Sequence, residues 1–283
     1  VQQIKKIAVI GAGPAGLAAA TVAAERGHQV TLFDSASEIG GQFNVAKRVP
    51  GKEEFSETLR YFSRKLQTTG VEVCLNTRVA VSDLLGAGYD EIILATGIAP
   101  RTPAIPGVEH EKVLNYLDVI LGRKPVGKSV AVIGAGGIGF DVSEYLVHKG
   151  VSTSLDCAAF WKEWGIDATL EARGGVAGIK AEPQAPARQV FLLQRKKTKV
   201  GDGLGKTTGW IHRTGLKNKQ VQMLNGVEYL SIDDAGLHIR IGEGEPQLLP
   251  VDNIVICAGQ DPLRELYDGL VEAGQNVHLI GGA

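Results

Sequence analysis

The chain has 283 residues, 44% of them hydrophobic and 22% charged, so it is long enough for about two domains and apolar enough to bury a core. Its 30 basic residues are balanced by 31 acidic ones, which argues against a nucleic-acid or membrane-surface protein, because either would need a basic excess. The 37 glycines lie well above the roughly 7% that is usual. They show no Gly-X-Y period and indicate tight turns and close backbone–ligand approach.

The three cysteines, Cys74, Cys157 and Cys257, are far apart in the sequence. This spacing excludes a disulfide scaffold, a zinc cluster and a CxxC redox pair within the chain. Without a CxxC pair, a disulfide reductase is excluded as well. The spacing predicts a reducing, cytoplasmic environment and no bound metal.

The first structural unit begins with a β-branched run, Ile7–Ile10, that is suited to a buried strand. A glycine-rich turn follows, then an alanine-rich helix over 15–26, and a second strand at Val30–Phe33. The segment 7–24 carries no charge, but its glycines and Pro14 would break a membrane helix, so we expect one βαβ unit and no membrane partner.

The same pattern returns about 123 residues later. A strand is predicted at Val130–Ile133, a turn at Gly134–Gly139 and a helix over 140–149. A repeated βαβ start at this spacing predicts two similar nucleotide-sized domains in tandem.

Further elements complete the two domains. We expect a helix over 53–68, a strand over 71–75, apolar strands at 91–97 and 254–259, and a proline-rich linker at 100–107. The fold class is therefore α/β, with two tandem doubly wound three-layer dinucleotide-binding domains of the FAD/NAD(P)-binding type. The first domain is predicted to be discontinuous, over 1–107 and 251–283, and the second to span 108–250.

The first glycine fingerprint is Gly11-x-Gly13-x-x-Gly16, followed by Asp34. In such a motif the first glycine makes the tight turn, the second admits a pyrophosphate, and the third lets helix and strand pack closely. The pyrophosphate lies on the helix N-terminus, and the acidic residue accepts hydrogen bonds from the ribose.

The second fingerprint is Gly134-x-Gly136-x-x-Gly139, with Asp141 two residues later. Two registers are open for the strand that follows. Val151–Leu155 would place Asp156 on the ribose and favour NADH, whereas the more apolar Val190–Leu193 ends in a basic run.

The later strand is favoured. Arg195 and Lys196 follow it and would bind the 2′-phosphate of NADPH, where a carboxylate would repel it. In this register 151–188 is an insertion, with Trp161 and Trp164 as its apolar anchors. Tandem dinucleotide domains then indicate a flavin in one and a nicotinamide in the other, with hydride transfer from NAD(P)H to the flavin.

Four motifs carry a family resemblance: Ile10–Gly16, Glu38–Phe43, Ile133–Asp141 and Leu204–Arg213. With these, the whole chain resembles the C-terminal half of the NADPH-dependent 2,4-dienoyl-CoA reductases. These belong to an iron–sulfur flavoenzyme family that also contains trimethylamine dehydrogenase. The first motif is shared by many flavoproteins, and the last is the most specific.

The resemblance implies positions for the FAD. Ala15 is expected at its pyrophosphate, Asp34 at its ribose, Gln42 beside it, and Val79 at the adenine through its backbone. Ala95-Thr96-Gly97 should pass near the pyrophosphate. Together with the fingerprints and the basic run, the predicted cofactor-binding residues are Gly11, Gly13, Pro14, Ala15, Gly16, Asp34, Gly41, Gln42, Val79, Ala95, Thr96, Gly97, Gly134, Gly136, Gly137, Ile138, Gly139, Asp141, Arg195 and Lys196.

The resemblance also implies what this chain should lack. In the family a (β/α)₈ barrel with FMN and a 4Fe–4S cluster precede this part, so the chain is expected to be a fragment, and no substrate-level catalytic residue is assigned to it. The predicted function is electron entry, from NADPH to FAD, for an enzyme that reduces an unsaturated acyl-CoA. Two alternatives stay open: a stand-alone FAD/NADPH reductase for a protein acceptor, similar to the glutamate synthase small subunit, and a non-catalytic scaffold that carries ADP.

Overall fold

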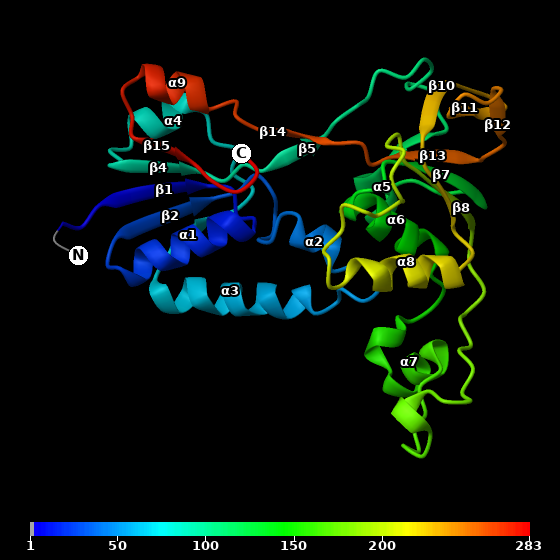
Figure 1. Cartoon of the computed structure of the whole chain (residues 1–283). Coiled ribbons are helices and arrows are strands. Elements are labelled where there is room, and N and C mark those ends of the chain that lie inside the picture. The colour runs from blue at the N-terminus through cyan, green and yellow to red at the C-terminus, as the bar shows by residue number, and fades with distance from the viewer. Residues whose placement is uncertain (1–2) are drawn as a thin grey trace. The chain divides into compact units, whose positions relative to one another are not determined.

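The computed structural model describes residues 3–283, which form two compact units (Figure 1). The first unit comprises the chain up to Lys47, Glu53–Ala99 and Gln260–Ala283. The second unit comprises Arg48–Lys52 and Pro100–Gly259. No helix in the described range is both long enough and apolar enough to cross a membrane.

The first unit is built on a five-stranded parallel sheet in the order β15-β4-β1-β2-β3. Its strands are β1 (Lys6–Ile10), β2 (Gln29–Phe33), β3 (Glu72–Cys74), β4 (Glu91–Leu94) and β15 (Val277–Leu279). Ala8 and Val9 are fully buried on opposite faces of β1. Burial on both faces explains why the central strand is a continuous apolar run.

Helices cover both faces of this sheet (Figure 1). On one face α1 (Pro14–Glu25) and α3 (Phe55–Thr69) enclose a core around Leu17, Leu32 and Leu66. On the other, α4 (Val81–Leu85) and α9 (Tyr267–Glu272) enclose Leu84, Ile92 and Leu270. The short α2 (Phe43–Ala46) precedes α3.

The second unit repeats this plan with a sheet in the order β6-β13-β7-β8-β9. Its parallel strands are β6 (Val113–Asn115), β7 (Ser129–Ile133), β8 (Gln189–Leu193), β9 (Gln222–Leu224) and β13 (Asn253–Ile256). The helices are α5 (Tyr116–Ile120), α6 (Gly137–Val147) and α8 (Gly209–Asn218). An antiparallel sheet of β10 (Val227–Asp233), β11 (Gly236–Ile241) and β12 (Gln247–Leu249) closes a core against β7, β8 and β13.

The α/β fold class predicted from the sequence is confirmed. The two segments by which the chain crosses between the units pair as β5 (Ile98–Pro100) and β14 (Gln260–Pro262). The helix expected over 140–149 begins three residues earlier in α6, because the fingerprint glycines themselves form its first turn.

The strand that follows the second fingerprint is the later of the two candidates. β8 lies beside β7 in parallel register, with Val190 opposite Val130 and Leu193 opposite Ile133. The earlier candidate holds only a short 3₁₀ turn, Thr153–Leu155.

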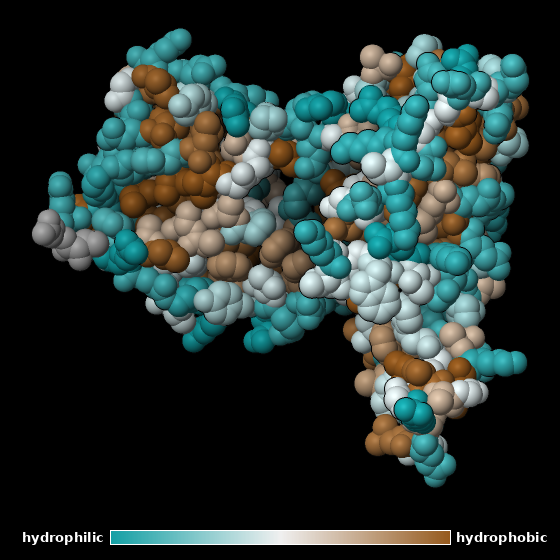
Figure 2. Space-filling view, in the orientation of Figure 1, coloured by the Kyte–Doolittle hydropathy of each residue, from teal (hydrophilic) through white to brown (hydrophobic). Residues whose placement is uncertain are grey.

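The segment between α6 and β8 carries α7 (Cys157–Trp164) and a second 3₁₀ turn, Arg173–Gly175. The two tryptophans were expected to anchor it, but Trp161 is 39% exposed and Trp164 is half-buried. Figure 2 shows hydrophobic side chains on its surface. Trp161 as an anchor was therefore wrong, because polar contacts organise the segment instead.

Two charged residues make the polar contacts that organise the segment between α6 and β8. Asp167 accepts hydrogen bonds from the N–H groups of Thr169, Glu171 and Ala172 at 2.7–2.9 Å. Lys219, whose side chain is 9% exposed, lies 2.6 Å from Glu144 on α6 and 3.6 Å from Glu163 on α7. A buried charge is costly unless it is paired, and Lys219 pairs with one carboxylate on each of α6 and α7.

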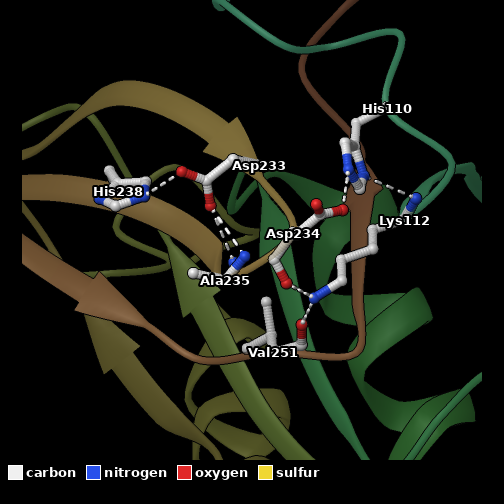
Figure 3. Close-up of polar contacts among 8 residues, drawn as sticks. His110, Lys112, Asp233, Asp234, Ala235, His238 and Val251 are labelled. Atoms are coloured by element: carbon white, nitrogen blue, oxygen red, sulfur yellow. Dashed lines mark hydrogen bonds and ion pairs between the residues drawn. The ribbon is translucent and has the colours of Figure 1, made fainter.

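The linker before β6 is tied to the β10–β11 hairpin in the same unit (Figure 3). His110 Nε2 lies 3.0 Å from Asp234 Oδ1, and Lys112 Nζ donates to the carbonyl oxygens of Asp234 and Val251. Asp233 accepts from Ala235 N–H within the turn itself. These contacts fix the segment that leads into the second sheet.

Candidate dinucleotide-binding sites

The glycine turn of the first unit is closely packed at two of its three glycines. Gly11 has a φ of +108°, and a Cβ atom there would lie 2.3 Å from the carbonyl oxygen of Ala95. A Cβ atom on Gly16 would lie 1.8 Å from the carbonyl oxygen of Gly11. Both positions therefore require glycine, one for the turn and one for the close approach of α1 to β1.

The middle glycine has open space beside it. Nothing lies within 4 Å of a Cβ atom built on Gly13, at the N-cap of α1. The first N–H groups of a helix have no partner within the helix and carry its positive dipole end. The arrangement fits a pyrophosphate placed on α1.

Two glycine loops border this space. A Cβ atom on Gly41 would lie 3.0 Å from the Cα atom of Gly13, and one on Gly281 would lie 2.8 Å from the Cβ atom of Ala15. Gly41 and Ala15 thus lie beside the N-terminus of α1. Gln42 is exposed at the N-cap of α2 and does not line the adjoining cavity.

That cavity, of about 270 Å³, opens at the carboxyl ends of β1 and β2. Asp34 lies in its wall and accepts hydrogen bonds from Ala12 N–H (2.6 Å) and Ala36 N–H (2.8 Å). A carboxylate has about four acceptor positions, so Asp34 keeps acceptor capacity for a ribose. The residues that line the cavity are Ile10, Gly11, Phe33, Asp34, Ser35, Thr77, Arg78, Val79, Thr96, Leu263, Glu265 and Leu266.

The structure thus brings four of the predicted residues, Gly11, Asp34, Val79 and Thr96, around one cavity. The Thr96 hydroxyl donates to the carbonyl oxygen of Leu263. Ala95 backs the turn at Gly11, and Gly97, with a φ of +76°, accepts from Leu263 N–H.

Sequence reasoning missed the far wall of the cavity. Arg78 Nη2 lies 2.8 Å from Glu265 Oε2 in an exposed ion pair, and Leu263 and Leu266 lie beside it. These side chains come from segments nearly 190 residues apart, and no motif marked them.

The second unit repeats the glycine geometry. Gly134 has a φ of +108°, and a Cβ atom there would lie 2.6 Å from the carbonyl oxygen of Cys257. A Cβ atom on Gly139 would lie 1.8 Å from the carbonyl oxygen of Gly134, whereas Gly136 and Gly137 have open space. Gly137 and Ile138 form the first turn of α6, so the same fit to a pyrophosphate holds here.

Asp141 lies one turn further along α6 and is held by a lysine. Lys52 Nζ lies 2.6 and 2.7 Å from its two carboxylate oxygens, in the wall of a second cavity of about 220 Å³. Lys52 was not predicted from the sequence. It belongs to a short segment, Arg48–Lys52, that is part of the second unit although the residues on both sides of it belong to the first.

Beyond β8 the chain makes a compact basic loop. Gln194 Nε2 donates to the carbonyl oxygens of Lys196 (3.0 Å) and Thr198 (2.8 Å). The side chains of Arg195 and Lys196 are exposed and form no ion pair within residues 3–283. Burial raises the pKa of Tyr229 to about 12, and the nearby charge of Arg195 acts in the opposite sense. The predicted 2′-phosphate ligands are therefore present at the carboxyl end of β8 as unpaired cations.

The three cysteines form no disulfide. Cys74, Cys157 and Cys257 are all free, and burial raises the pKa of the Cys257 thiol, with the charge of Asp141 acting in the same direction. A raised pKa keeps a thiol protonated and unreactive. In the described part of the chain, no three His, Cys, Asp or Glu side chains are arranged to hold a metal ion.

Comparisons with known proteins identify the family of the chain. The family model of the pyridine nucleotide-disulphide oxidoreductases matches residues 5–280. A metal reductase of Desulforamulus reducens is 29% identical over 98% of this chain, and an NADH oxidase of Thermoanaerobacter brockii is 30% identical over 99% of it. The chain spans only 41% and 38% of these two relatives.

Among solved structures, a 2-naphthoyl-CoA reductase complex superposes with a TM-score of 0.80 at 24% identity. The match covers 99% of this chain and 37% of that one, and it shows the shared fold. Such a family implies an oxidoreductase that uses FAD and a nicotinamide dinucleotide. On the match to residues 5–280 and the two glycine turns, the chain belongs to the pyridine nucleotide-disulphide oxidoreductase family.

Proposed function

We propose that the chain is an NADPH-dependent flavin reductase module, in which the first unit binds FAD and the second binds NADPH. The observation that carries this proposal is the duplicated glycine turn, since Gly13 and Gly136 both have open space at a helix N-terminus. One such turn accounts for one dinucleotide, and two account for a pair that exchanges a hydride.

In the first unit, the contacts of the glycine turn and of Asp34 support the role proposed for each residue in FAD binding. The N-terminus of α1 and the space beside Gly13 hold the pyrophosphate. Asp34 is fixed by two backbone N–H groups and accepts from the ribose hydroxyls. Val79 and Leu263 line the cavity that takes the adenosine end. Bound there, FAD supplies the capacity to accept a hydride and pass electrons on.

In the second unit α6 plays the same part. Gly136 leaves the space for the pyrophosphate, and Arg195 and Lys196 are the cations for a 2′-phosphate. The Asp141 carboxylate holds the Lys52 ammonium in a fixed position at the second cavity. A lysine held in this way presents its remaining N–H donors without a large entropy cost on ligand binding.

The acceptor beyond the flavin is a finer part of the proposal. The Leu204–Arg213 motif supports a 2,4-dienoyl-CoA reductase type of enzyme, in which electrons pass through a 4Fe–4S cluster and FMN to an unsaturated acyl-CoA. A naphthoyl-CoA reductase among the structural neighbours is consistent with an acyl-CoA acceptor. In this proposal the cluster and the FMN belong to parts that this chain does not contain.

Two experiments on the purified chain test the core of the proposal. After incubation with FAD and gel filtration, the chain should show flavin absorption in the visible range. Addition of NADPH without oxygen should bleach that absorption. If the chain retains ADP but no flavin, the scaffold alternative is supported instead. If NADPH does not bleach the bound flavin, the proposed reductase function is wrong.

The nicotinamide preference has its own test. Removing the charge-assisted bonds of Arg195 and Lys196 should weaken NADPH about 10- to 100-fold and leave NADH nearly unchanged. The measurement is competitive binding of the two cofactors to wild type and to Arg195→Ala/Lys196→Ala. An unchanged NADPH:NADH ratio would contradict the assignment, and Asp156→Ala serves as the control for the rejected register.

A further inference from the structure

A groove runs along the edge of the second sheet, between α8 and the last strand in the sheet order. β9 pairs with β8 on one side, and among the described residues it has no strand on its other side. The groove has a volume of about 770 Å³. Trp210, Arg213 and Lys217 line it from α8, at the spacing of one helical face, and Val221 and Met223 line it from the sheet edge. None of these residues belongs to the two proposed dinucleotide sites.

The open edge of β9 presents backbone groups for a further strand. The carbonyl oxygen of Leu224 accepts a hydrogen bond from Gln194 N–H at 2.8 Å, so the backbone groups of Leu224 point toward β8. Neighbouring residues of a parallel strand direct their N–H and C=O groups to opposite sides. The N–H and C=O groups of Met223 therefore point to the open edge, where an extended segment of another chain can pair with them.

The side chains along the groove carry charge of one sign. Lys199, Arg213 and Lys217 line it, and no carboxylate of the described chain does. Arg213 Nη1 donates to the carbonyl oxygen of Gly201 (2.9 Å), a neutral partner that uses one of its five guanidinium donors. Cations gathered without counter-charges repel one another, and an anionic partner relieves that repulsion. The groove therefore favours an acidic ligand.

An exposed tryptophan adds apolar surface to the same face of α8. Trp210 Nε1 donates to the carbonyl oxygen of Thr207 (3.0 Å), while the residue remains 56% exposed. Arg213 lies about one turn further along the helix. Tryptophan and arginine are among the residue types that contribute most binding energy in protein interfaces. Together with the open strand edge, they indicate a surface that binds another polypeptide.

Charge argues against a second copy of this chain as the partner. Pairing of β9 with β9 about a two-fold axis places the same patch of both copies together, so the cations of one groove would meet those of the other. A nucleic acid would neutralise the cations, but it has no peptide groups to continue the hydrogen-bond ladder of β9. An acidic polypeptide segment in an extended conformation meets both requirements.

We propose that an acidic, extended segment of a protein partner docks in this groove and adds as a strand to β9. Every second side chain of such a strand faces α8. There its carboxylates pair with Lys199, Arg213 and Lys217, and an apolar side chain packs on Trp210. This surface is separate from both proposed dinucleotide sites and binds its partner whether or not they hold cofactors.

A short labelled peptide tests the charge and the aromatic contact. The peptide alternates glutamate with threonine and carries one leucine among the glutamates, and fluorescence anisotropy should show that it binds the wild type. Lys199→Gln/Lys217→Gln should weaken this binding about 3- to 30-fold, because two exposed ion pairs are lost. Trp210→Ala should weaken it about tenfold or more. Lys180→Gln removes an exposed cation of the same unit outside the groove and should leave the affinity unchanged.

Two N-methylated isomers of the peptide test the strand pairing. One carries N-methyl groups on its glutamates and leucine and the other on its threonines, so each isomer has one blocked edge when it is extended. One isomer should bind like the parent peptide and the other should not, because only one edge of the peptide faces β9. Equal affinities of the two isomers would overturn the addition of a strand.

Other occupants of the groove give different results. If the wild type does not bind the peptide, or if oligothymidylate binds as tightly and responds to the same variants, the groove is not a site for an acidic strand. Thermal unfolding of every variant should match that of the wild type, so a loss of binding reports the groove and not an unfolded chain. A wild-type dimer in sedimentation experiments that Trp210→Ala dissociates would identify a second copy as the partner and contradict the proposal.

Discussion

At the residue scale, the two glycine turns separate structural from functional glycines. Gly11, Gly16, Gly134 and Gly139 have no room for a side chain, because a Cβ atom on any of them would lie within 2.6 Å of a carbonyl oxygen. Gly13 and Gly136 have ordinary negative φ angles and open space. The fold therefore tolerates a methyl group at the middle position, whereas a bound pyrophosphate does not.

This contrast predicts variants that fold but do not bind. Gly13→Ala should leave the free energy of unfolding within about 1 kcal/mol of wild type, because alanine fits the backbone there without strain. Its methyl group enters the space for the pyrophosphate, so FAD binding should be lost while NADPH binding stays. Gly136→Ala should do the reverse. Thermal unfolding and cofactor titrations check both, and a Gly13→Ala chain with wild-type FAD affinity would remove the assigned position.

Asp34 yields a second prediction at this scale. Asp34→Ala removes the acceptor for the ribose and also the partner of Ala12 and Ala36 N–H. FAD affinity should fall about 10- to 100-fold, and NADPH affinity should hardly change. Asp34→Asn keeps one acceptor oxygen, so its FAD affinity in a flavin titration should lie between those of wild type and Asp34→Ala. If NADPH is the ligand that is lost, the two units have been assigned in reverse.

At the scale of elements, the apolar strands were predictable and the polar packing was not. β8 could be chosen over Val151–Leu155 because Val190 to Leu193 is a continuous apolar run, as a strand buried on both faces requires. The segment 151–188 gave no such signal. Its two tryptophans were predicted to be apolar anchors, but Asp167 and Lys219 organise it through hydrogen bonds and ion pairs that no sequence period reveals.

Asp167 gives this segment a pH dependence. Hydrogen bonds from Ala172 N–H, and then from the Thr169 hydroxyl, lower the pKa of Asp167 to about 2. A carboxylate whose pKa is lower when folded than when unfolded stabilises the fold fully above the unfolded value, near 4. That contribution is lost as the pH falls toward 2. Hydrogen exchange over residues 151–188 should therefore quicken between about pH 4 and pH 2 relative to the strands of the second unit.

Asp167→Asn is the control for this effect. It removes the titrating group, so its exchange should be faster than wild type at neutral pH and should show no extra increase in the same pH window. Equal pH profiles for wild type and Asp167→Asn would show that the carboxylate does not govern the segment.

At the scale of the whole molecule, the tandem α/β fold and its two glycine turns could be predicted from the duplicated sequence pattern. Lys52, Arg78 and Glu265 could not, because each meets its partner across 89 or 187 positions of the chain. Such side chains carry no local motif, and only the folded topology brings them to a cavity. The two relatives are more than twice as long as this chain.

The proposed function predicts which electron acceptors this chain can reduce by itself. With FAD and NADPH present, the chain should reduce a small diffusible quinone, because hydride entry and flavin reduction need only the two dinucleotide sites. It should not consume 2,4-dienoyl-CoA. Three free, scattered cysteines cannot ligate a 4Fe–4S cluster, so the proposed route to FMN and the acyl-CoA is not built into these residues. Gly136→Ala should abolish the quinone reduction, which shows that it depends on the second unit. Consumption of dienoyl-CoA by the chain alone would place the acyl-CoA site within the two units and overturn the electron-entry role.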